Sequence, residues 1–156
     1  MREVIYFSYT GTSEKIARVI SSHLNCRMGQ IKPIRNRSYP EWLILSFIPG
    51  LGVKVVHEGI EGHEIILCFP KWTFNCPPVT SFIKSGNLKG RRVFMIVACG
   101  GWRPESYTVR YAGLIEKHGG HVVGWRIVKK KHVDAVLESN ELFEEVKNAF
   151  STVKGD

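Results

Sequence analysis

Near its beginning the sequence reads VIYFSYTGTS over residues 4–13, where an apolar run gives way to hydroxyl groups and a single glycine. A short continuous apolar run is typical of a strand that is buried on both faces of a parallel sheet. Beyond the hydroxyl groups, apolar residues recur at helical spacing, at Ile16, Ala17, Ile20 and Leu24. This stretch therefore predicts a strand, a short loop, and a helix that runs to about Leu24.

The loop over residues 8–13 carries four serine and threonine hydroxyl groups and Gly11 at the expected N-terminus of that helix. The N–H groups of a first helical turn lack intrahelical partners and the helix dipole is positive there, so such a loop can bind a phosphate without Lys or Arg. Gly11 would let the backbone approach the ligand closely. The loop matches neither the GxxxxGK[ST] nor the GxGxxG pattern. An ordinary N-cap is the alternative interpretation, because Ser and Thr are common at that position.

Further apolar runs at residues 64–70, 92–99 and 121–128 predict buried strands, and residues 30–34 predict a short, weak one. Helices with one apolar face are predicted after these strands, the last with a break near residues 139–140. Strands that alternate with helices indicate the α/β class, with a doubly wound, five-stranded parallel sheet covered by helices on both faces. Ligands bind such sheets beyond the carboxyl ends of the strands.

The composition is that of an ordinary globular domain. At roughly 150 residues per domain, the chain of 156 residues predicts a single domain over residues 1–156, with an insert of unclear structure at about 35–62. With 44% hydrophobic and 23% charged residues, the composition excludes a disordered or collagen-like chain. The 22 Lys and Arg outnumber the 14 Asp and Glu, which gives a formal net charge of +8 and favours acidic partners. No nucleic-acid partner is expected, since no RRM, helix-turn-helix or KH pattern accompanies the charge.

The chain has four cysteines and no CxxC pair, the cysteines being Cys26, Cys68, Cys76 and Cys99. This spacing argues against a zinc or iron–sulfur site, and the six histidines form no HExxH pattern, so no metal is expected. Cys68 and Cys99 lie in apolar runs and are typical of buried thiols in a reducing compartment. The sequence has no signal-peptide pattern and no apolar stretch of the roughly 18 residues that a membrane span needs, so a cytoplasmic protein is expected.

Three loops carry a resemblance to a known family. The pattern [ST]-x-T-G-x-[ST] follows the first strand, with its fixed positions at Ser8, Thr10, Gly11 and Ser13. Residues 66–74 contain a Pro-x-Trp after the next long strand, and residues 97–102 follow with a Gly-Gly-Trp. Together these segments resemble the phosphate loop and the third-strand and fourth-strand loops of the flavodoxin family. The resemblance extends from about residue 3 to 128, apart from residues 35–62.

The resemblance implies a flavodoxin-like sheet of strand order 2-1-3-4-5 that binds FMN non-covalently. The phosphate is expected on the first loop, and the flavin ring between the second and third. Trp72, Phe74 and Trp102 are candidates to stack on the ring, the alternative being aromatic residues that cover the rim of the core. No catalytic residue is predicted. The expected cofactor-binding residues are Ser8, Tyr9, Thr10, Gly11, Thr12, Ser13, Pro70, Lys71, Trp72, Thr73, Phe74, Cys99, Gly100, Gly101 and Trp102.

The function that the resemblance implies is electron transfer, in which no side chain need act as acid or base. Two alternatives stay open at this point. One is an FMN-dependent NAD(P)H oxidoreductase that reduces a quinone or a flavin, and the other is a binding module that kept the fold without the flavin. Bleaching of the flavin by NAD(P)H alone would favour the first, and a colourless protein without affinity for FMN the second.

The positive charge departs from the usual flavodoxin pattern, since flavodoxins that shuttle electrons are usually acidic. Residues 129–131 are three lysines after the fifth strand, and Lys71 and Arg103 belong to the flavin loops. We expect these side chains on one edge of the sheet, where they would meet an acidic redox protein or a small anionic electron donor or acceptor. A solvated charge run is the alternative.

The apolar insert around residues 42–51 has no firm assignment beyond a short helix and a loop. It could be a lid over the flavin, a dimer contact or a membrane-touching patch, and packing within the fold is the favoured interpretation. A homodimer therefore stays open.

Overall fold

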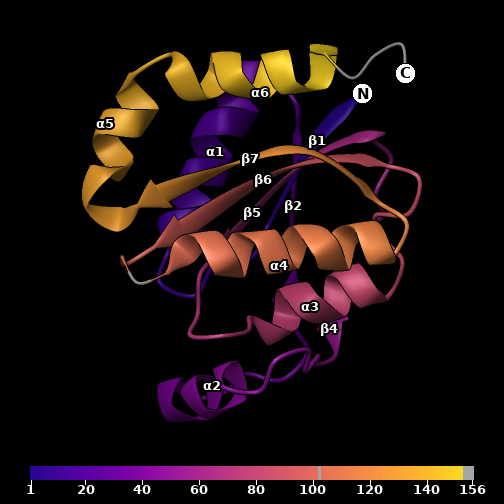
Figure 1. Ribbon diagram of the computed structural model, residues 1–156, viewed down its shortest axis with the longest axis vertical. Coiled ribbons are helices and arrows are strands. Elements are labelled where there is room, and N and C mark those ends of the chain that lie inside the picture. The colour runs from indigo at the N-terminus through magenta and orange to yellow at the C-terminus, as the bar shows by residue number, and fades with distance from the viewer. Residues whose placement is uncertain (102, 153–156) are drawn as a thin grey trace.

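A parallel sheet forms the centre of the protein, whose computed structural model describes residues 1–101 and 103–152. Its strands are, in spatial order, β2 (Arg27–Gln30), β1 (Arg2–Tyr6), β5 (Glu64–Pro70), β6 (Arg92–Cys99) and β7 (His121–Lys129) (Figure 1). Every neighbouring pair is parallel. Counted along the chain, these five strands have the order 2-1-3-4-5, so the predicted doubly wound α/β sheet is confirmed.

Helices cover both faces of the sheet (Figure 1). One face is covered by α1 (Thr12–Leu24) and α6 (Glu141–Thr152), and the other by α3 (Pro77–Lys84) and α4 (Pro104–Lys117). The connection from β7 to α6 consists of η1 (Lys130–His132) and α5 (Val133–Glu138), so the predicted break before the last helix is confirmed. Within the described residues, no helix combines the length and the apolar character that crossing a membrane requires.

Alternate residues of the central strands belong to two separate cores. In β5, Ile65, Leu67 and Phe69 belong to the core beneath α3 and α4, whereas Ile66 and Cys68 belong to the core beneath α1 and α6. All five side chains are buried, which is why a strand of this kind appears in the sequence as a continuous apolar run. The expectation of buried thiols at Cys68 and Cys99 is confirmed.

The prediction of a strand at residues 30–34 is wrong in its position. The second strand of the sheet is β2, which pairs with β1 from Arg27 to Gln30. Residues 32–33 form β3 (Lys32–Pro33), which pairs antiparallel with β4 (Val55–Val56) in a separate two-stranded sheet. Because β2 lies at the edge of the main sheet with exposed and half-buried side chains, its sequence RMGQ carries no apolar run.

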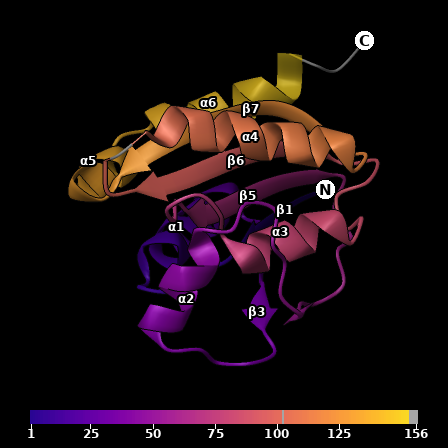
Figure 2. The same ribbon diagram turned by 60° about the horizontal axis from the view of Figure 1, so that its bottom comes forward.

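The insert contains a helix, α2 (Tyr39–Ser46), that lies outside both helical layers in the two views (Figures 1 and 2). It is followed by a loop that Asn75 holds against the fold. The side-chain amide of Asn75 donates to the carbonyl oxygens of Ile48 at 2.9 Å and Leu51 at 2.8 Å. The insert is therefore attached to the segment that follows β5, at the carboxyl edge of the sheet.

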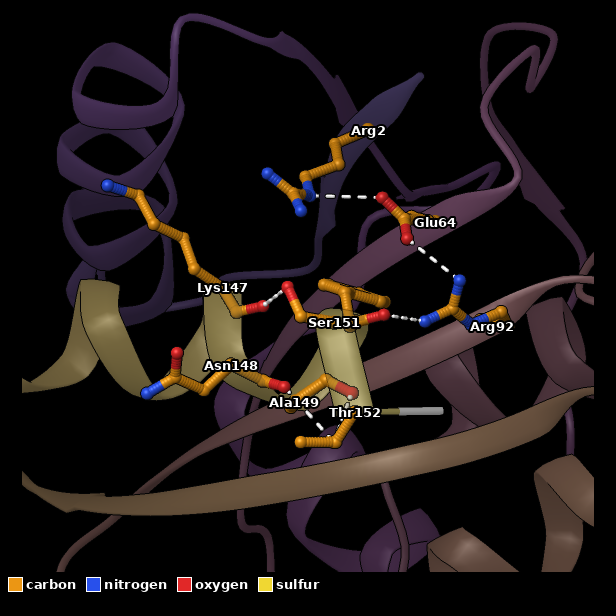
Figure 3. A network of polar contacts seen from close by, with 9 residues as sticks. Arg2, Glu64, Arg92, Lys147, Asn148, Ala149, Ser151 and Thr152 are labelled. Carbon is orange, nitrogen blue, oxygen red and sulfur yellow. Dashed lines mark hydrogen bonds and ion pairs between the residues drawn. The ribbon is translucent and has the colours of Figure 1, made fainter. Parts of the chain in front are cut away.

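The opposite edge, where the strands begin, is held by a network of ion pairs (Figure 3). The Glu64 carboxylate accepts from Arg2 and from Arg92, each at 3.0 Å, and Arg92 also donates to the carbonyl oxygen of Phe150 in α6. These side chains are partly exposed, so each ion pair contributes about 0.2–1 kcal/mol. The network ties β1, β5 and β6 to α6 and leaves the carboxyl edge to the loops.

Candidate functional site at the carboxyl edge of the sheet

The loop after β1 makes a tight turn into α1. Gly11 is the N-cap residue of α1 and has a φ of 101°, in the left-handed region that other residues rarely adopt. The hydroxyl oxygen of Ser8 accepts a hydrogen bond from the Gly11 N–H at 3.0 Å, which holds the turn closed. The Lys15 N–H donates to the Gly11 carbonyl oxygen at 3.0 Å. The N–H groups of residues 12–14 have no intrahelical acceptor, as in the first turn of any helix. Glycine has no side chain with which to cap them, so they stay open.

Ser13, in the first turn of α1, has a buried hydroxyl group. The residue is 2% exposed, and its Oγ has no hydrogen-bond partner among the described residues. Leaving a buried hydroxyl unpaired costs about 1–3 kcal/mol. This hydroxyl, the open N–H groups and the positive end of the helix dipole together form a donor set that suits an anion.

Trp72, in the loop after β5, lies at the centre of a cluster of aromatic rings from separate parts of the chain. Its ring centroid is 5.4 Å from that of Phe7, 6.1 Å from that of Tyr9 and 5.5 Å from that of Trp42 in α2. Aromatic pairs in such geometries contribute about 0.5–1.5 kcal/mol each beyond their burial. The cluster fixes the Trp72 ring beside the loop after β1 and joins both loops to α2.

Tyr107 of α4 and strand β6 hold the start of the loop after β5. The hydroxyl of Tyr107 donates to the carbonyl oxygen of Pro70 at 3.0 Å and accepts from the Trp72 N–H at 3.4 Å. The Lys71 N–H donates to the carbonyl oxygen of Ala98 at 2.7 Å. Burial raises the pKa of Tyr107, so the hydroxyl keeps the proton that it donates. The backbone under Trp72 is therefore anchored independently of the aromatic cluster.

Two titratable groups near these loops have shifted pKa values. Burial lowers the pKa of the Lys71 amine, whose Nζ donates to the carbonyl oxygen of Thr73 at 3.3 Å. Burial raises the pKa of the Cys99 thiol, although the Gly101 N–H and the lysines at positions 129 and 71 act in the opposite direction. Since only the thiolate is a strong nucleophile, a thiol with a raised pKa is suited to packing and not to covalent chemistry.

These loops and α2 enclose a cleft of about 240 Å³. Its lining comes from the loop after β1, α2, the loop after β5 and η1, and consists of Tyr9, Thr10, Tyr39, Trp42, Leu43, Ser46, Lys71, Trp72, Thr73 and Lys130. A second hollow of about 390 Å³ adjoins it, shares Tyr9 and Trp42 with it and reaches Ser8. Aromatic and apolar walls with a few polar groups are typical of sites for small organic ligands. Because such sites usually measure about 300–1,000 Å³, a ligand in this cleft would stay partly exposed.

Comparison with known proteins identifies the fold. No protein-family model matches the chain. A flavoprotein of Lactobacillus acidophilus, whose crystal structure is a complex with FMN, has a TM-score of 0.67 at 15% identity, over 86% of this chain and 96% of that one. The two-electron reduced flavodoxin of Megasphaera elsdenii has a TM-score of 0.53 at 19% identity, over 82% and 85% of the two chains. By fold, the chain is a flavodoxin-like protein.

This flavodoxin-like protein also has a relative in sequence. An uncharacterized protein of Archaeoglobus fulgidus is 41% identical to it over 128 residues, which cover 82% of this chain and 85% of that protein. The two chains belong to one family.

The flavodoxin-like protein brings most of the expected residues of its first two loops together. Five of them, Tyr9, Thr10, Lys71, Trp72 and Thr73, line the cleft. The turn beside it is formed by Ser8, Gly11, Thr12 and Ser13. Pro70 and Cys99 are the last residues of β5 and β6, so they support the loops from the sheet.

The remaining expected residues are placed differently. Phe74 lies against Phe47, with ring centroids 5.8 Å apart, and its carbonyl oxygen accepts from Arg110, so it contacts the insert and α4. Gly100 and Gly101 are exposed in the loop after β6, and Gly101 has a φ of 131°. Trp102 lies outside the described residues.

The sequence analysis raised a lid over the flavin only as one alternative for the insert and assigned none of its residues to the site. Tyr39, Trp42, Leu43 and Ser46 all line the cleft. The backbone of Ser46 accepts from the Phe74 N–H at 3.0 Å, so the helix is held directly against the loop after β5. An apolar run over residues 42–48 was the available signal, but it does not say against which surface the helix packs.

Proposed function

We propose that the protein binds FMN non-covalently and uses it to transfer electrons. The observation that carries the proposal is the turn into α1, with its left-handed Gly11, its open N–H groups and the buried, unpaired hydroxyl of Ser13. A phosphate group would satisfy all of these donors at once. The fold is consistent with this, because a flavoprotein in complex with FMN shares it.

The phosphate of FMN would be held by the backbone N–H groups of residues 12–14 and by the Ser13 hydroxyl. Thr10 and Thr12 add hydroxyl groups at the same turn, and Ser8 keeps the turn in shape. A Cβ on Gly11 would meet nothing within 4 Å, so the backbone angle and not a lack of space requires glycine there. Charge-assisted hydrogen bonds and the helix dipole stabilise the anion without a basic side chain.

The flavin ring would lie in the cleft beside Trp72. Trp72 and Tyr9 offer aromatic surface, and Trp42 of α2 adds to it. FMN supplies the redox chemistry when it is bound, and the chain orients it and excludes water from part of its surface. No side chain is assigned an acid or base role.

The first experiment compares FMN with riboflavin, which lacks the phosphate, in fluorescence titrations of the flavin-free protein. FMN should bind about a hundredfold more tightly, because two or more charge-assisted hydrogen bonds are lost with the phosphate. Gly11→Val should remove this preference. Gly86→Val is the matched control, since Gly86 also has a left-handed φ, of 80°, with open space around it, but lies after α3. Equal affinities for the two flavins, or a Gly11→Val variant with full affinity, would overturn the phosphate assignment.

The second experiment separates an electron carrier from an NAD(P)H oxidoreductase. NADPH is added to the FMN-loaded protein in the absence of oxygen, and the visible spectrum is followed. A carrier should keep its flavin oxidised with NADPH alone and become reduced only when dithionite or a redox protein supplies electrons. Rapid bleaching by NADPH would contradict the carrier role and favour the oxidoreductase.

We also propose that the electron partner is an acidic redox protein or a small anion. Lys130 lines the cleft, and Lys129 and Lys131 are exposed beside it. Asp134 in α5 is the acidic residue nearest in sequence to them, and it is paired with Lys15 of α1. Positive charge at the mouth of the cleft would raise the rate of encounter with anions and lower it for cations, more so at low salt.

Small acceptors of opposite charge test this steering. The reduced protein should transfer electrons to ferricyanide faster at low salt than at high salt, and to hexaammineruthenium(III) more slowly. Lys130→Gln/Lys131→Gln should weaken both salt effects. Lys89→Gln/Lys117→Gln removes the same charge from exposed positions just before β6 and β7, at the edge where the strands begin. This variant should leave both salt effects unchanged. Equal salt effects in the two variants would show that no steering occurs at the cleft.

A further inference from the structure

The helix α2 and the residues after it expose a run of large apolar side chains. Ile44 is 65% exposed, Phe47 52% and Ile48 47%, and Tyr39 and Leu43 are exposed beside them. The Phe47 ring also contacts the exposed ring of Phe74, which extends the surface toward the loop after β5. Single exposed apolar residues are common on proteins, whereas a contiguous group marks a surface that something covers. We call Ile44, Phe47, Ile48 and Phe74 the α2 patch.

Only one side of α2 packs against the rest of the protein. Its buried residues are Trp42 and Ser46, which are one helical turn apart and face the cleft. The opposite side carries Ile44, and Phe47 and Ile48 continue this apolar surface beyond the end of the helix. Apolar helix surface is normally buried against another surface. The uncovered side of α2 therefore needs an apolar medium or partner.

Two cations lie beside the α2 patch. Lys84 donates to the carbonyl oxygen of Gly50, just after Ile48, and Arg110 donates to the carbonyl oxygen of Phe74. The guanidinium of Arg37 lies over the Trp42 ring at 5.2 Å. Arg37 therefore lies on the cleft side of α2, whereas Lys84 and Arg110 place positive charge at the edge of the patch itself.

We propose that the α2 patch seats the protein on the surface of an anionic lipid bilayer. Apolar side chains beside cations match the boundary between acyl chains and anionic headgroups, where interfacial helices lie. Eight residues of helix extend about 12 Å, which suits a segment lying in the interface and not across it. A second copy of this chain is a poorer occupant, because a two-fold contact would bring the positive edges together. The proposal does not depend on FMN binding.

Sedimentation of the full chain with lipid vesicles tests the proposal. Vesicles of phosphatidylcholine alone and of phosphatidylcholine mixed with phosphatidylglycerol are compared at low and high salt. The protein should bind the anionic vesicles, bind the neutral ones far less, and be released by salt. Lys84→Gln/Arg110→Gln should reproduce the effect of salt, because these are the cations beside the patch.

The apolar part of the surface is tested with two exposed aromatic residues. Phe47→Ser should weaken binding to the anionic vesicles about tenfold, because one apolar side chain no longer enters the interface. Trp125→Ser is the matched control, since Trp125 is 40% exposed on the edge strand β7, outside the insert, and should change binding little. Circular dichroism confirms that both variants are folded.

Three results would overturn the proposal. One is a lack of binding to anionic vesicles at low salt, and another is an equal loss of binding in the two serine variants. The third is a dimer, or a complex with an acidic protein, that forms without lipid and that Phe47→Ser dissociates, as measured by light scattering. That result would assign the patch to a protein partner.

Discussion

The hydroxyl of Ser13 is buried in the first turn of α1 without a partner among the described residues. In the ligand-free protein this atom lowers stability, because a buried hydroxyl has lost its hydrogen bonds to water. With a phosphate in place the same atom becomes a donor. Binding and stability therefore place opposite demands on this one side chain.

Replacement of Ser13 by alanine should separate the two effects. Ser13→Ala should raise the free energy of unfolding of the ligand-free protein by about 1 kcal/mol and weaken FMN binding about tenfold. Urea denaturation and FMN titration measure the two quantities. Thr108→Val is the control, because the Thr108 hydroxyl is buried but donates to the Pro104 carbonyl oxygen at 2.7 Å. Thr108→Val should lose stability without losing FMN affinity. A Ser13→Ala variant that is less stable than the wild-type protein would contradict the view that the Ser13 hydroxyl is unpaired.

Single residues also mark how far sequence reasoning could go. The turn at Gly11 was predictable, because its left-handed φ depends on the four or five residues around it. The surroundings of Trp72 were not, because its ring meets Trp42, thirty positions earlier in the chain. A residue's local conformation follows from near neighbours, but its ring partners follow from the tertiary fold.

The loop after α2 is attached to the fold through Asn75. The side-chain amide of Asn75 donates to the carbonyl oxygens of Ile48 and Leu51, and its Oδ1 accepts from Thr80 at 2.5 Å and from Tyr111 at 3.1 Å. One buried side chain thereby connects the loop after α2 with α3 and α4. If it is removed, two carbonyl oxygens and two hydroxyl groups lose a partner.

Asn75→Ala should release the insert before the rest of the molecule unfolds. Amide hydrogens of residues 43–51 should exchange faster in hydrogen-exchange mass spectrometry, by the equivalent of about 2 kcal/mol of opening free energy. FMN affinity should fall with it, because α2 lines the cleft. Asn87→Ala is the control, since Asn87 donates to the Phe82 carbonyl oxygen within the same segment of chain. If the insert exchanges equally fast in both variants, Asn75 is not its anchor.

Elements differed in how well their sequences predicted them. The strands β5 and β6 were found because burial on both faces leaves an unbroken apolar run. The edge strand β7 is mostly half-buried, but its sequence also contains enough apolar residues to be found. The edge strand β2 was misplaced because half-exposed side chains and Gly29 give no such run. The helix α2 was left open because a helix without a polar side has no helical periodicity to detect.

In the molecule as a whole, the parallel sheet followed from the alternation of strands and helices and the strand order from the flavodoxin resemblance, whereas the cleft followed from neither. The alternation restricts the topology to few arrangements, and the observed order is one of them. The cleft needs α2, whose position depends on the contacts of Asn75 and Ser46 with the loop after β5. A motif search therefore finds the turn at Gly11 and misses the side of the cleft that α2 forms.

Folding of the two cores also buries titratable groups from both sides of the sheet. Cys68 lies in one core and Cys76 in the other, and both are fully buried. Burial raises the pKa of each thiol because the thiolate would lose its hydration, and it raises the pKa of Tyr107 and Tyr111 in the same way. In the unfolded chain these thiols regain a pKa of about 8.5.

Stability should therefore fall as the pH rises above about 8.5, where unfolded thiols ionise and native ones do not. The native state then binds more protons than the unfolded state, so each buried thiol lowers the free energy of unfolding by about 1.4 kcal/mol per pH unit. Below that pH both states hold the proton and the contribution is complete.

Urea denaturation in a reducing buffer, from neutral pH to about pH 10, measures how the free energy of unfolding falls with pH. Cys68→Ala should remove one thiol's share of this fall, whereas Cys26→Ala, at a half-buried thiol, should remove less. If the free energy of unfolding falls equally steeply with pH in the wild-type protein and in Cys68→Ala, the buried thiol does not cause the loss of stability at alkaline pH.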